Sequence, residues 1–452
     1  MKAATRVVAP IGYTPVIPST DTCMLSLHPA RKRGKPSSRA PARIGLAIAG
    51  GGPIGGMYEL GALRALDEAI EGLDLTDLDS YVGVSSGAFL AAGLANRMST
   101  EQMCRIFITG DSDDARFRPD TFLRPALYEY LQRAANLPRL TLDWWRSVLL
   151  DPLDVRWSEL INRFGGLVPT GLFDNNEVER FLRDIFTRRG RSNDFRELDA
   201  RLFVVAVELD SGEPVLFGAA GWEDVPISRA VQASAALPGL YPPVEVRGRH
   251  LVDGALRRTM HASVLLERDI DLLIGINPLV PFNAGLGDAR SGEPVDDDHD
   301  GQRLVHGGLP AVLSQTFRTL LQSRMHVGLA KYAQQYPDID QLVFEPNARD
   351  GELFHTSAFS FAARRRVCQL AWRNTIDDLR RRADDLRPVL AASGIRLRDE
   401  ILEDDDRTLL DGLAERRPPS TDTTAKLRRA LDATERVIAR RKRAPGARAR
   451  SR

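Results

Sequence analysis

The sequence predicts an α/β protein built on a mainly parallel, layered sheet. Short apolar runs, such as Ile44–Ala49 and Leu202–Leu209, have the composition of strands buried on both faces. Segments in which apolar residues recur at helical spacing alternate with these runs along the chain. Alternation of strands with helices is the order of elements that a parallel sheet requires.

The composition is that of a globular protein long enough for one or two domains. The 452 residues include 62 basic and 61 acidic side chains, so the net charge of +1 gives no reason to expect a nucleic-acid partner. The three cysteines, Cys23, Cys104 and Cys368, lie far apart and form no CxxC pair. This spacing argues against a disulfide framework or a zinc site and favours a reducing compartment.

The apolar residues nowhere form a run of eighteen, so we expect no membrane-spanning helix. Prolines at positions 10, 15 and 18 interrupt the N-terminal stretch, and a secretory signal is therefore not expected. Together these features predict a cytoplasmic protein, with contact to a membrane surface left open.

The first predicted strand, Ile44–Ala49, leads directly into the glycine-rich turn Gly50–Gly56 and then into a helix. Such a turn presents backbone N–H groups to an anion at the start of a helix. The spacing Gly50-x-Gly52-x-x-Gly55 fits a dinucleotide fingerprint, which needs an acidic residue at the end of the second strand.

The second strand, Tyr81–Val84, ends instead at a serine. In a dinucleotide fingerprint the acid lies about 20 residues after the glycines. Three acids lie near that distance, but they precede the second strand: Asp74, Asp77 and Asp79. We therefore interpret the glycine-rich turn as an oxyanion hole, in which the N–H groups of Gly51 and Gly52 face Ser85.

The stretch Tyr81–Gly87 has the strand–turn–helix context of a nucleophile elbow. Such a turn is so tight that the residues two before and two after the serine must lack side chains, and Gly83 and Gly87 meet this demand. Ser85 would project from the turn between Val84 and Ser86, with its hydroxyl over the N-terminus of the next helix.

The remaining elements continue the alternation. We predict strands at 202–209, 214–217, 250–253, 272–276 and 341–344, and helices at 227–236, 309–335 and 361–391. The aromatic-rich stretch 144–157 is predicted to be helical, as a lid, a lipid-facing surface or core. Residues 285–308 read as a loop, whose acidic stretch Asp296–His299 does not match a calcium site.

A serine needs a base within hydrogen-bond reach, and two pairings are open. The first is a triad of Ser85, Asp253 and a histidine. The second is a dyad in which Asp253, at a strand end before Gly254 and Ala255, takes the proton directly; a dry pocket would raise its basicity. The candidate histidines are His261, His299, His306, His326 and His355.

These features in this order resemble the patatin-like phospholipases. The glycine-rich turn, Gly83–Gly87 and Asp253–Ala255 carry the resemblance. It extends over about residues 43–280, through the stretches Gly171–Asp174, Glu208–Glu213, Ala233–Pro238 and Tyr241–Val244.

The resemblance implies a three-layer α/β/α fold and hydrolysis of acyl esters in lipids by a Ser–Asp dyad, without cofactor or metal. Ser85 would be the nucleophile and Asp253 the base, supported by Gly254 and Ala255. The oxyanion loop would comprise Gly50, Gly51, Gly52, Pro53, Ile54 and Gly55. The family usually has Arg or Lys at the position of Ile54, which puts in doubt catalytic efficiency and a preference for anionic phospholipid.

We expect four regions in the chain. A disordered basic tail, 1–42, precedes a catalytic core, 43–290, and helices with a strand packed on that core, 291–395. A charged tail, 396–452, follows, in which a basic amphipathic helix could contact an anionic membrane. Two other functions stay open: a lipid-binding protein that turns over poorly and, more weakly, a nucleotide-binding protein.

Overall fold

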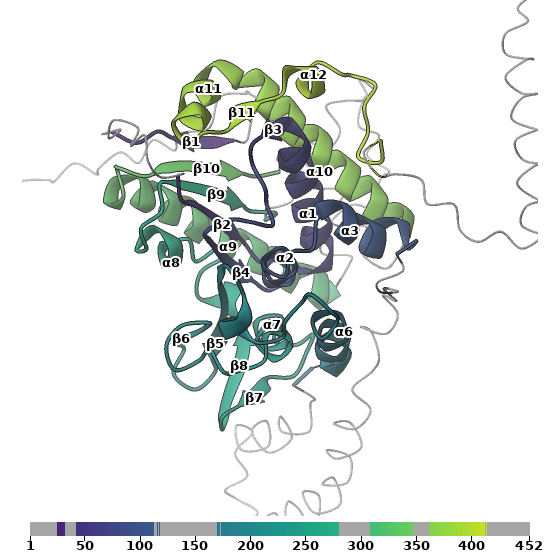
Figure 1. Ribbon diagram of the computed structural model, residues 1–452. Helices are drawn as coiled ribbons and strands as arrows, with labels where there is room; N and C mark the ends of the chain where they lie inside the picture. Colours follow the sequence, from purple (N-terminus) through teal and green to yellow (C-terminus); the bar gives the residue numbers. More distant parts are fainter. Residues whose placement is uncertain are drawn as a thin grey trace, which may run out of the picture.

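The computed structural model describes residues 25–31, 42–112, 115, 117, 170–171, 173–279, 308–346, 361–411 and 413. Within these ranges a central sheet is covered by helices on both faces (Figure 1). The three-layer α/β/α arrangement and the mainly parallel sheet predicted above are therefore confirmed.

The described residues contribute nine strands to this sheet, in the order β1-β10-β9-β2-β4-β5-β8-β7, with β6 paired to β5. The strands β10, β9, β2, β4 and β5 run parallel, whereas β1, β6 and β8 run antiparallel to their neighbours and β7 pairs antiparallel with β8. Their bounds are β1 Ser26–His28, β2 Ile44–Ile48, β4 Ser80–Val84, β5 Arg201–Glu208, β6 Pro214–Phe217, β7 Val244–Val246, β8 Arg249–Asp253, β9 Leu272–Ile276 and β10 Asp340–Phe344.

The helices belong to two layers, each with its own hydrophobic core. One core packs α8 and α9 against strand residues such as Ala47 and Val82, and the other packs α1, α2 and α10 against their neighbours Leu46 and Tyr81. Successive strand residues thus serve opposite faces, as the pleat requires. The helix bounds are α1 Gly52–Ala69, α2 Ser86–Ala95, α3 Thr100–Cys104, α6 Asn176–Phe186, α7 Ile227–Ser234, α8 Ser263–Leu266, α9 Gly308–Gln335, α10 Phe361–Arg381, α11 Ala383–Ala392 and α12 Asp399–Leu402, with a π-helical turn at Arg105–Thr109 and 3-10 turns at Phe195–Glu197 and Gly254–Leu256.

Helices α1 and α10 lie side by side over much of their length (Figure 1). A methyl group placed on Gly61 of α1 would lie only 2.2 Å from the carbonyl oxygen of Cys368 in α10. Glycine at this position therefore lets the two backbones approach closely. The expected helix 361–391 is two helices, because α10 ends at Arg381 and α11 begins at Ala383.

The N-terminal region contains a strand that the sequence did not predict. Residues 26–28 form β1, which pairs antiparallel with β10, and the Leu25 carbonyl accepts a hydrogen bond from Arg382. The expectation of disorder over all of 1–42 is therefore wrong for these residues. Leu25 is buried and Leu27 packs against the core, and this contact outweighs the polar surroundings.

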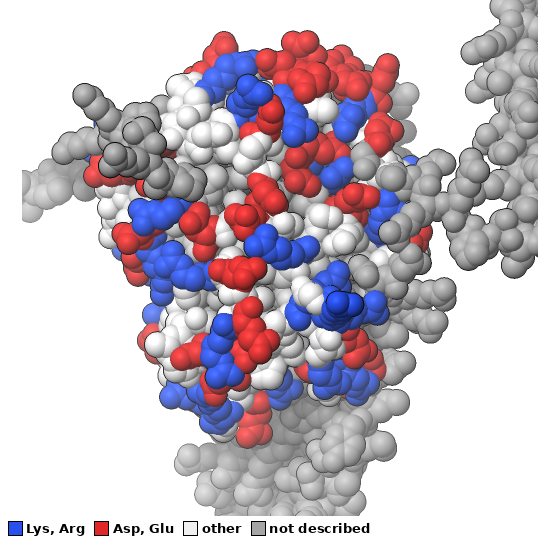
Figure 2. Space-filling model, in the orientation of Figure 1, with Lys and Arg blue, Asp and Glu red and all other residues white. Residues whose placement is uncertain are grey.

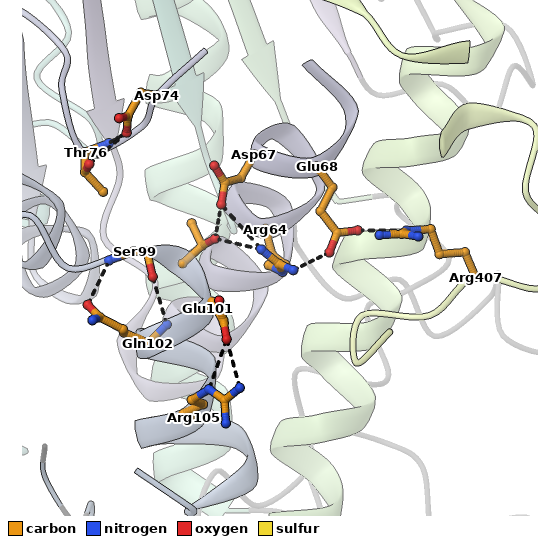
Figure 3. Close-up of polar contacts among 11 residues, drawn as sticks. Arg64, Asp67, Glu68, Asp74, Thr76, Ser99, Glu101, Gln102, Arg105 and Arg407 are labelled. Carbon is orange, nitrogen blue, oxygen red and sulfur yellow. Dashed lines mark hydrogen bonds and ion pairs between the residues drawn. The ribbon is translucent and has the colours of Figure 1, made fainter. Parts of the chain in front are cut away.

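The segment 396–411 is also packed on the core, although it was expected to belong to a charged tail. Arg396–Leu397 forms β11, which pairs with β3, Ile70–Glu71, at the end of α1. Arg407 forms an ion pair of 3.1 Å with Glu68, which pairs in turn with Arg64 at 2.5 Å (Figure 3). The charges of this segment are thus partly used for internal pairing, and its leucines at 397, 402 and 409 are buried.

Acidic and basic side chains are interspersed on the face shown in Figure 2, as the near-zero net charge suggests. Among the described residues, no helix combines the length and the apolar character needed to cross a membrane. The predicted helical insertion 144–157, the loop at 285–307 and the basic helix at 424–452 lie outside the described residues.

Candidate active site

Ser85 stands on a sharp turn between β4 and α2. Its backbone has φ 52° and ψ −119°, a left-handed conformation that is strained for a residue with a side chain. A methyl group on Gly83 would lie 2.4 Å from the Cα of Ala88, and one on Gly87 would lie 2.4 Å from the carbonyl oxygen of Ile48. Both glycines are therefore required by close backbone packing, as the elbow interpretation predicts.

A serine from another helix holds this turn in place. The backbone N–H of Ser85 donates to Ser234 Oγ at 2.8 Å, and the Ser234 hydroxyl donates to the Val205 carbonyl at 2.6 Å. Ser234 is the last residue of α7, and Val205 lies in β5 beside β4. Through these two bonds the elbow is tied to the neighbouring helix and strand.

Asp253 ends β8, where it pairs with Ala206 of β5. Its carboxylate accepts hydrogen bonds from the Ser85 side chain and, at 2.9 Å, from the N–H of Ala255. The side chain is buried, with 2% of the residue exposed. Burial raises the pKa of Asp253 to about 6, although the two hydrogen bonds act in the opposite direction. The structure therefore brings together the two residues that the sequence singled out and makes the carboxylate a stronger base.

The glycine-rich loop between β2 and α1 is the third part of the site, next to Ser85 and the end of β8. A methyl group on Gly50 would lie 3.0 Å from the Cβ of Ser85 and 3.2 Å from the Cβ of Ala255. The loop, the elbow and the end of β8 thus meet at one edge of the sheet. This is where the carboxyl ends of β2, β4 and β9 lie, the usual position of ligand sites in open α/β sheets.

The N–H groups of this loop are not equivalent. Gly50 donates to the Thr259 carbonyl at 3.1 Å and Gly51 donates to Ser86 Oγ at 2.9 Å, so both bind within the protein. Of the two donors expected from sequence, Gly51 and Gly52, Gly51 is therefore already occupied. Gly52 begins α1, where the helix offers its N–H no acceptor, and the same holds for Ile54 in the first turn. Pro53 has no N–H, and the N–H of Gly55 donates to the Gly51 carbonyl.

The histidines do not join this arrangement where the structure describes them. Among the five candidates, only His261 has a described side chain. Its Nε2 lies 3.3 Å from the Gly254 carbonyl, and burial lowers its pKa to about 4. The Ser85 side chain bonds directly to the Asp253 carboxylate, without His261 between them.

Three residues near the site have roles that the sequence analysis missed. Ser234 supports the elbow, Thr259 accepts from the loop, and Glu59 accepts a hydrogen bond of 3.0 Å from Ser86. Only Glu59 had a local signal, since it is an acid among the apolar residues of a helix that is buried over most of its length. In the described part of the chain, no group of three or more His, Cys, Asp or Glu residues is arranged to hold a metal ion.

Comparison with solved structures gives only distant similarities. VipD from Legionella pneumophila is 20% identical, with 54% of this chain and 51% of that chain covered and a TM-score of 0.29. ExoU from the type III secretion system of Pseudomonas aeruginosa, in a complex with SpcU, is 15% identical, with 68% and 54% covered and a TM-score of 0.26. Human GIVD cytosolic phospholipase A2 is 12% identical, with 80% and 60% covered and a TM-score of 0.31. This chain thus spans about half the length of the first two, and scores this low carry no argument about function.

The comparison with family models is specific. Residues 46–266 match the model of the patatin-like phospholipase family. The matched region begins in β2 and ends in α8, so it contains the glycine-rich loop, Ser85 and Asp253. The region that carries Ser85 and Asp253, residues 46–266, is therefore similar to the patatin-like phospholipase family, and this region is just under half of the chain.

Proposed function

We propose that the protein hydrolyses acyl ester bonds of lipids through a Ser85–Asp253 dyad and an acyl-enzyme intermediate. The observation that carries this proposal is the hydrogen bond between the Ser85 side chain and the buried Asp253 carboxylate, beside a glycine-rich loop. The family match supports lipid as the substrate class. Contact with a membrane through the basic segments near both ends of the chain stays a prediction.

The reaction begins with attack of Ser85 Oγ on the ester carbonyl carbon. Asp253 accepts the hydroxyl proton, and its raised pKa brings its basicity closer to neutral pH than that of an exposed aspartate. The oxyanion of the tetrahedral intermediate is stabilised by N–H groups at the start of α1, of which that of Gly52 is the first, and by the N-terminus of α2.

Collapse of the intermediate expels the alcohol, which takes the proton held by Asp253. A water molecule then attacks the acyl-enzyme while Asp253 again accepts a proton, and Ser85 leaves with that proton. Ile54 is buried in the first turn of α1, so the loop has an apolar side chain where the family usually places a cation. This favours esters whose alcohol part carries no negative charge near the loop.

Replacement of the nucleophile tests the proposal. Ser85→Ala is expected to abolish p-nitrophenyl ester hydrolysis and fluorophosphonate labelling, because Ser86, the other hydroxyl of the elbow, bonds to Glu59 and not to Asp253. The matched control is Ser211→Ala, which removes an exposed hydroxyl bonded to Glu208 in the turn before β6. It should keep both activities, and circular dichroism should show both variants folded.

Two outcomes would contradict the proposal. Hydrolysis that survives in Ser85→Ala would reject the nucleophile, and absence of hydrolysis in the wild type on every lipid class screened would favour a lipid-binding role. Asp253→Asn should be nearly as inactive as Ser85→Ala. Retained labelling in Asp253→Asn, together with a large loss on replacing one histidine, would favour the triad.

A further inference from the structure

A buried acid, Glu59, lies next to the glycine-rich loop. Burial and a hydrogen bond from Ser86 shift its pKa, and no charged side chain contributes to that shift. Glu59 of α1 is fully buried, with 0% of the residue exposed. Its Oε1 accepts a hydrogen bond of 3.0 Å from the Ser86 hydroxyl, and its Oε2 has no hydrogen-bond partner among the described residues. Burial raises the pKa of Glu59 well above its ordinary value, and the bond from Ser86 offsets this only in part. Burial therefore favours the neutral form of the Glu59 carboxyl group.

The hydrogen bond from Ser86 continues to the loop. Ser86 Oγ accepts the N–H of Gly51 at 2.9 Å while its hydroxyl donates to Glu59. Ser86 also follows the nucleophile directly, as the first residue of α2. One side chain at the start of α2 thus connects the elbow with both the glycine-rich loop and Glu59 of α1.

The loop is confined from the other side as well. A methyl group on Gly51 would lie 2.3 Å from Pro278 Cγ, so the Gly51 peptide fits between Pro278 and Ser86. Gly52 follows with φ 65°, a conformation that glycine adopts freely and that local interactions therefore do not fix. The direction of the Gly52 N–H consequently depends on how firmly the preceding peptide is held.

We propose that Glu59 is a positioning residue for the oxyanion loop, acting through Ser86 on the Gly51 peptide so that the Gly52 N–H keeps one direction. This inference rests on the proposed function, because it assigns a role in the same acyl transfer. Glu59 itself touches neither the substrate nor the reacting atoms. A carboxyl group suits this position because it accepts a hydrogen bond from Ser86, and its burial disfavours a negative charge near the developing oxyanion.

Substitutions of Glu59 separate positioning from packing. Glu59→Leu keeps the volume but removes the acceptor, so kcat for a p-nitrophenyl ester should fall about tenfold to a hundredfold while KM stays within about twofold. The rate of fluorophosphonate labelling should fall with kcat. Because a poorly bonded buried polar group is removed, Tm should stay equal or rise. Glu59→Gln retains an acceptor oxygen and should restore kcat to within about threefold of wild type.

The matched control is the same substitution at the other buried acid of α1. Glu68 pairs with Arg64 and Arg407, so Glu68→Leu leaves two arginines without this partner (Figure 3). It should lower Tm by several degrees and leave kcat close to wild type. Glu59→Leu should therefore lower kcat without lowering Tm, whereas Glu68→Leu should lower Tm and leave kcat close to wild type.

The outcomes distinguish this inference from the proposed function. Wild-type kcat in Glu59→Leu, or a fall in kcat that follows a fall in Tm and is not restored by Glu59→Gln, overturns the positioning role while Ser85-dependent hydrolysis stands. If the wild type itself hydrolyses no ester, the proposed function is rejected instead. A selective fall in kcat, restored by glutamine, supports the role of Glu59.

Discussion

Asp253 is a buried carboxylate with one hydroxyl partner and one backbone partner, and its pKa is raised to about 6 by burial. In the proposed dyad, Asp253 must be unprotonated to accept the proton of Ser85. A raised pKa means that protonation begins at higher pH than for an ordinary aspartate, so activity is lost as the pH falls through about 6 and is retained above it.

We therefore predict an acid limb in the pH profile. The value of kcat/KM for a p-nitrophenyl ester should decrease about tenfold for each pH unit below the pKa of Asp253. Stopped assays between about pH 4 and 8 would measure the limb, with Tm recorded at each pH to exclude unfolding. A profile that stays flat down to about pH 4.5 would show that Asp253 titrates like an exposed aspartate or is not the base.

At the scale of single residues, the sequence located the paired side chains of Ser85 and Asp253 better than the residues that hold them in place. Ser85 was singled out by its glycine-flanked turn, and Asp253 by its place at a strand end before Gly254 together with the order of the other motifs. Ser234 could not be found, since it contacts Ser85 across 149 positions of the chain. The use of the Gly51 N–H by Ser86 was missed for a similar reason, because hydrogen-bond partners across 35 residues depend on the packing of two helices.

Among the elements, α7 supports the elbow although it carries no reacting group. Its last residue, Ser234, bonds both to the Ser85 N–H and to the Val205 carbonyl. Ser234→Ala should leave the buried N–H of Ser85 unpaired, at a cost of about 1–3 kcal/mol in the free energy of unfolding. It should also lower kcat, since the strained turn at Ser85 loses a contact that holds it.

Urea denaturation and steady-state kinetics on Ser234→Ala would test this prediction. Ser228→Ala in the same helix is the matched control, because Ser228 bonds to Asn193 and Glu179 away from the elbow. If Ser228→Ala lowers kcat as much as Ser234→Ala does, the effect belongs to α7 as a whole. If Ser234→Ala changes neither quantity, the contact does not support the elbow.

The elements themselves were largely predictable, because buried parallel strands are continuous apolar runs and helices have a clear period. The hairpin partner β6 and the strands β8, β9 and β10 lie where they were expected. Short elements were missed: β1 and β11 have three and two residues, too few to show a period. These two strands form because β1 pairs with β10 and β11 pairs with β3, and not because of a local preference of their residues.

For the molecule as a whole, the segment 396–411 stabilises the domain from a position far outside the residues that match the family. Leu409 is fully buried, and its N–H donates to Gln369 of α10 at 3.0 Å. Leu409→Ala should lower the free energy of unfolding by about 2–5 kcal/mol, the usual cost of a leucine deleted from a core. It should leave KM and kcat unchanged below the melting range, because the dyad lies on other elements.

Chemical denaturation of Leu409→Ala would measure this contribution to the free energy of unfolding. The matched control is Leu410→Ala, since Leu410 is only partly buried. A loss in Leu409→Ala no greater than in Leu410→Ala would show that the segment packs weakly. A lowered kcat at full folding would show that the segment also influences the site.

Strand β1 has a consequence for handling the protein. It occupies the free side of β10, whose backbone groups would otherwise be open to pairing with another chain. A shortened version that starts at residue 42, just before β2, would remove this cover and leave the apolar strand β10 bare. Preparations trimmed in that way should self-associate, even though every reacting group is still present.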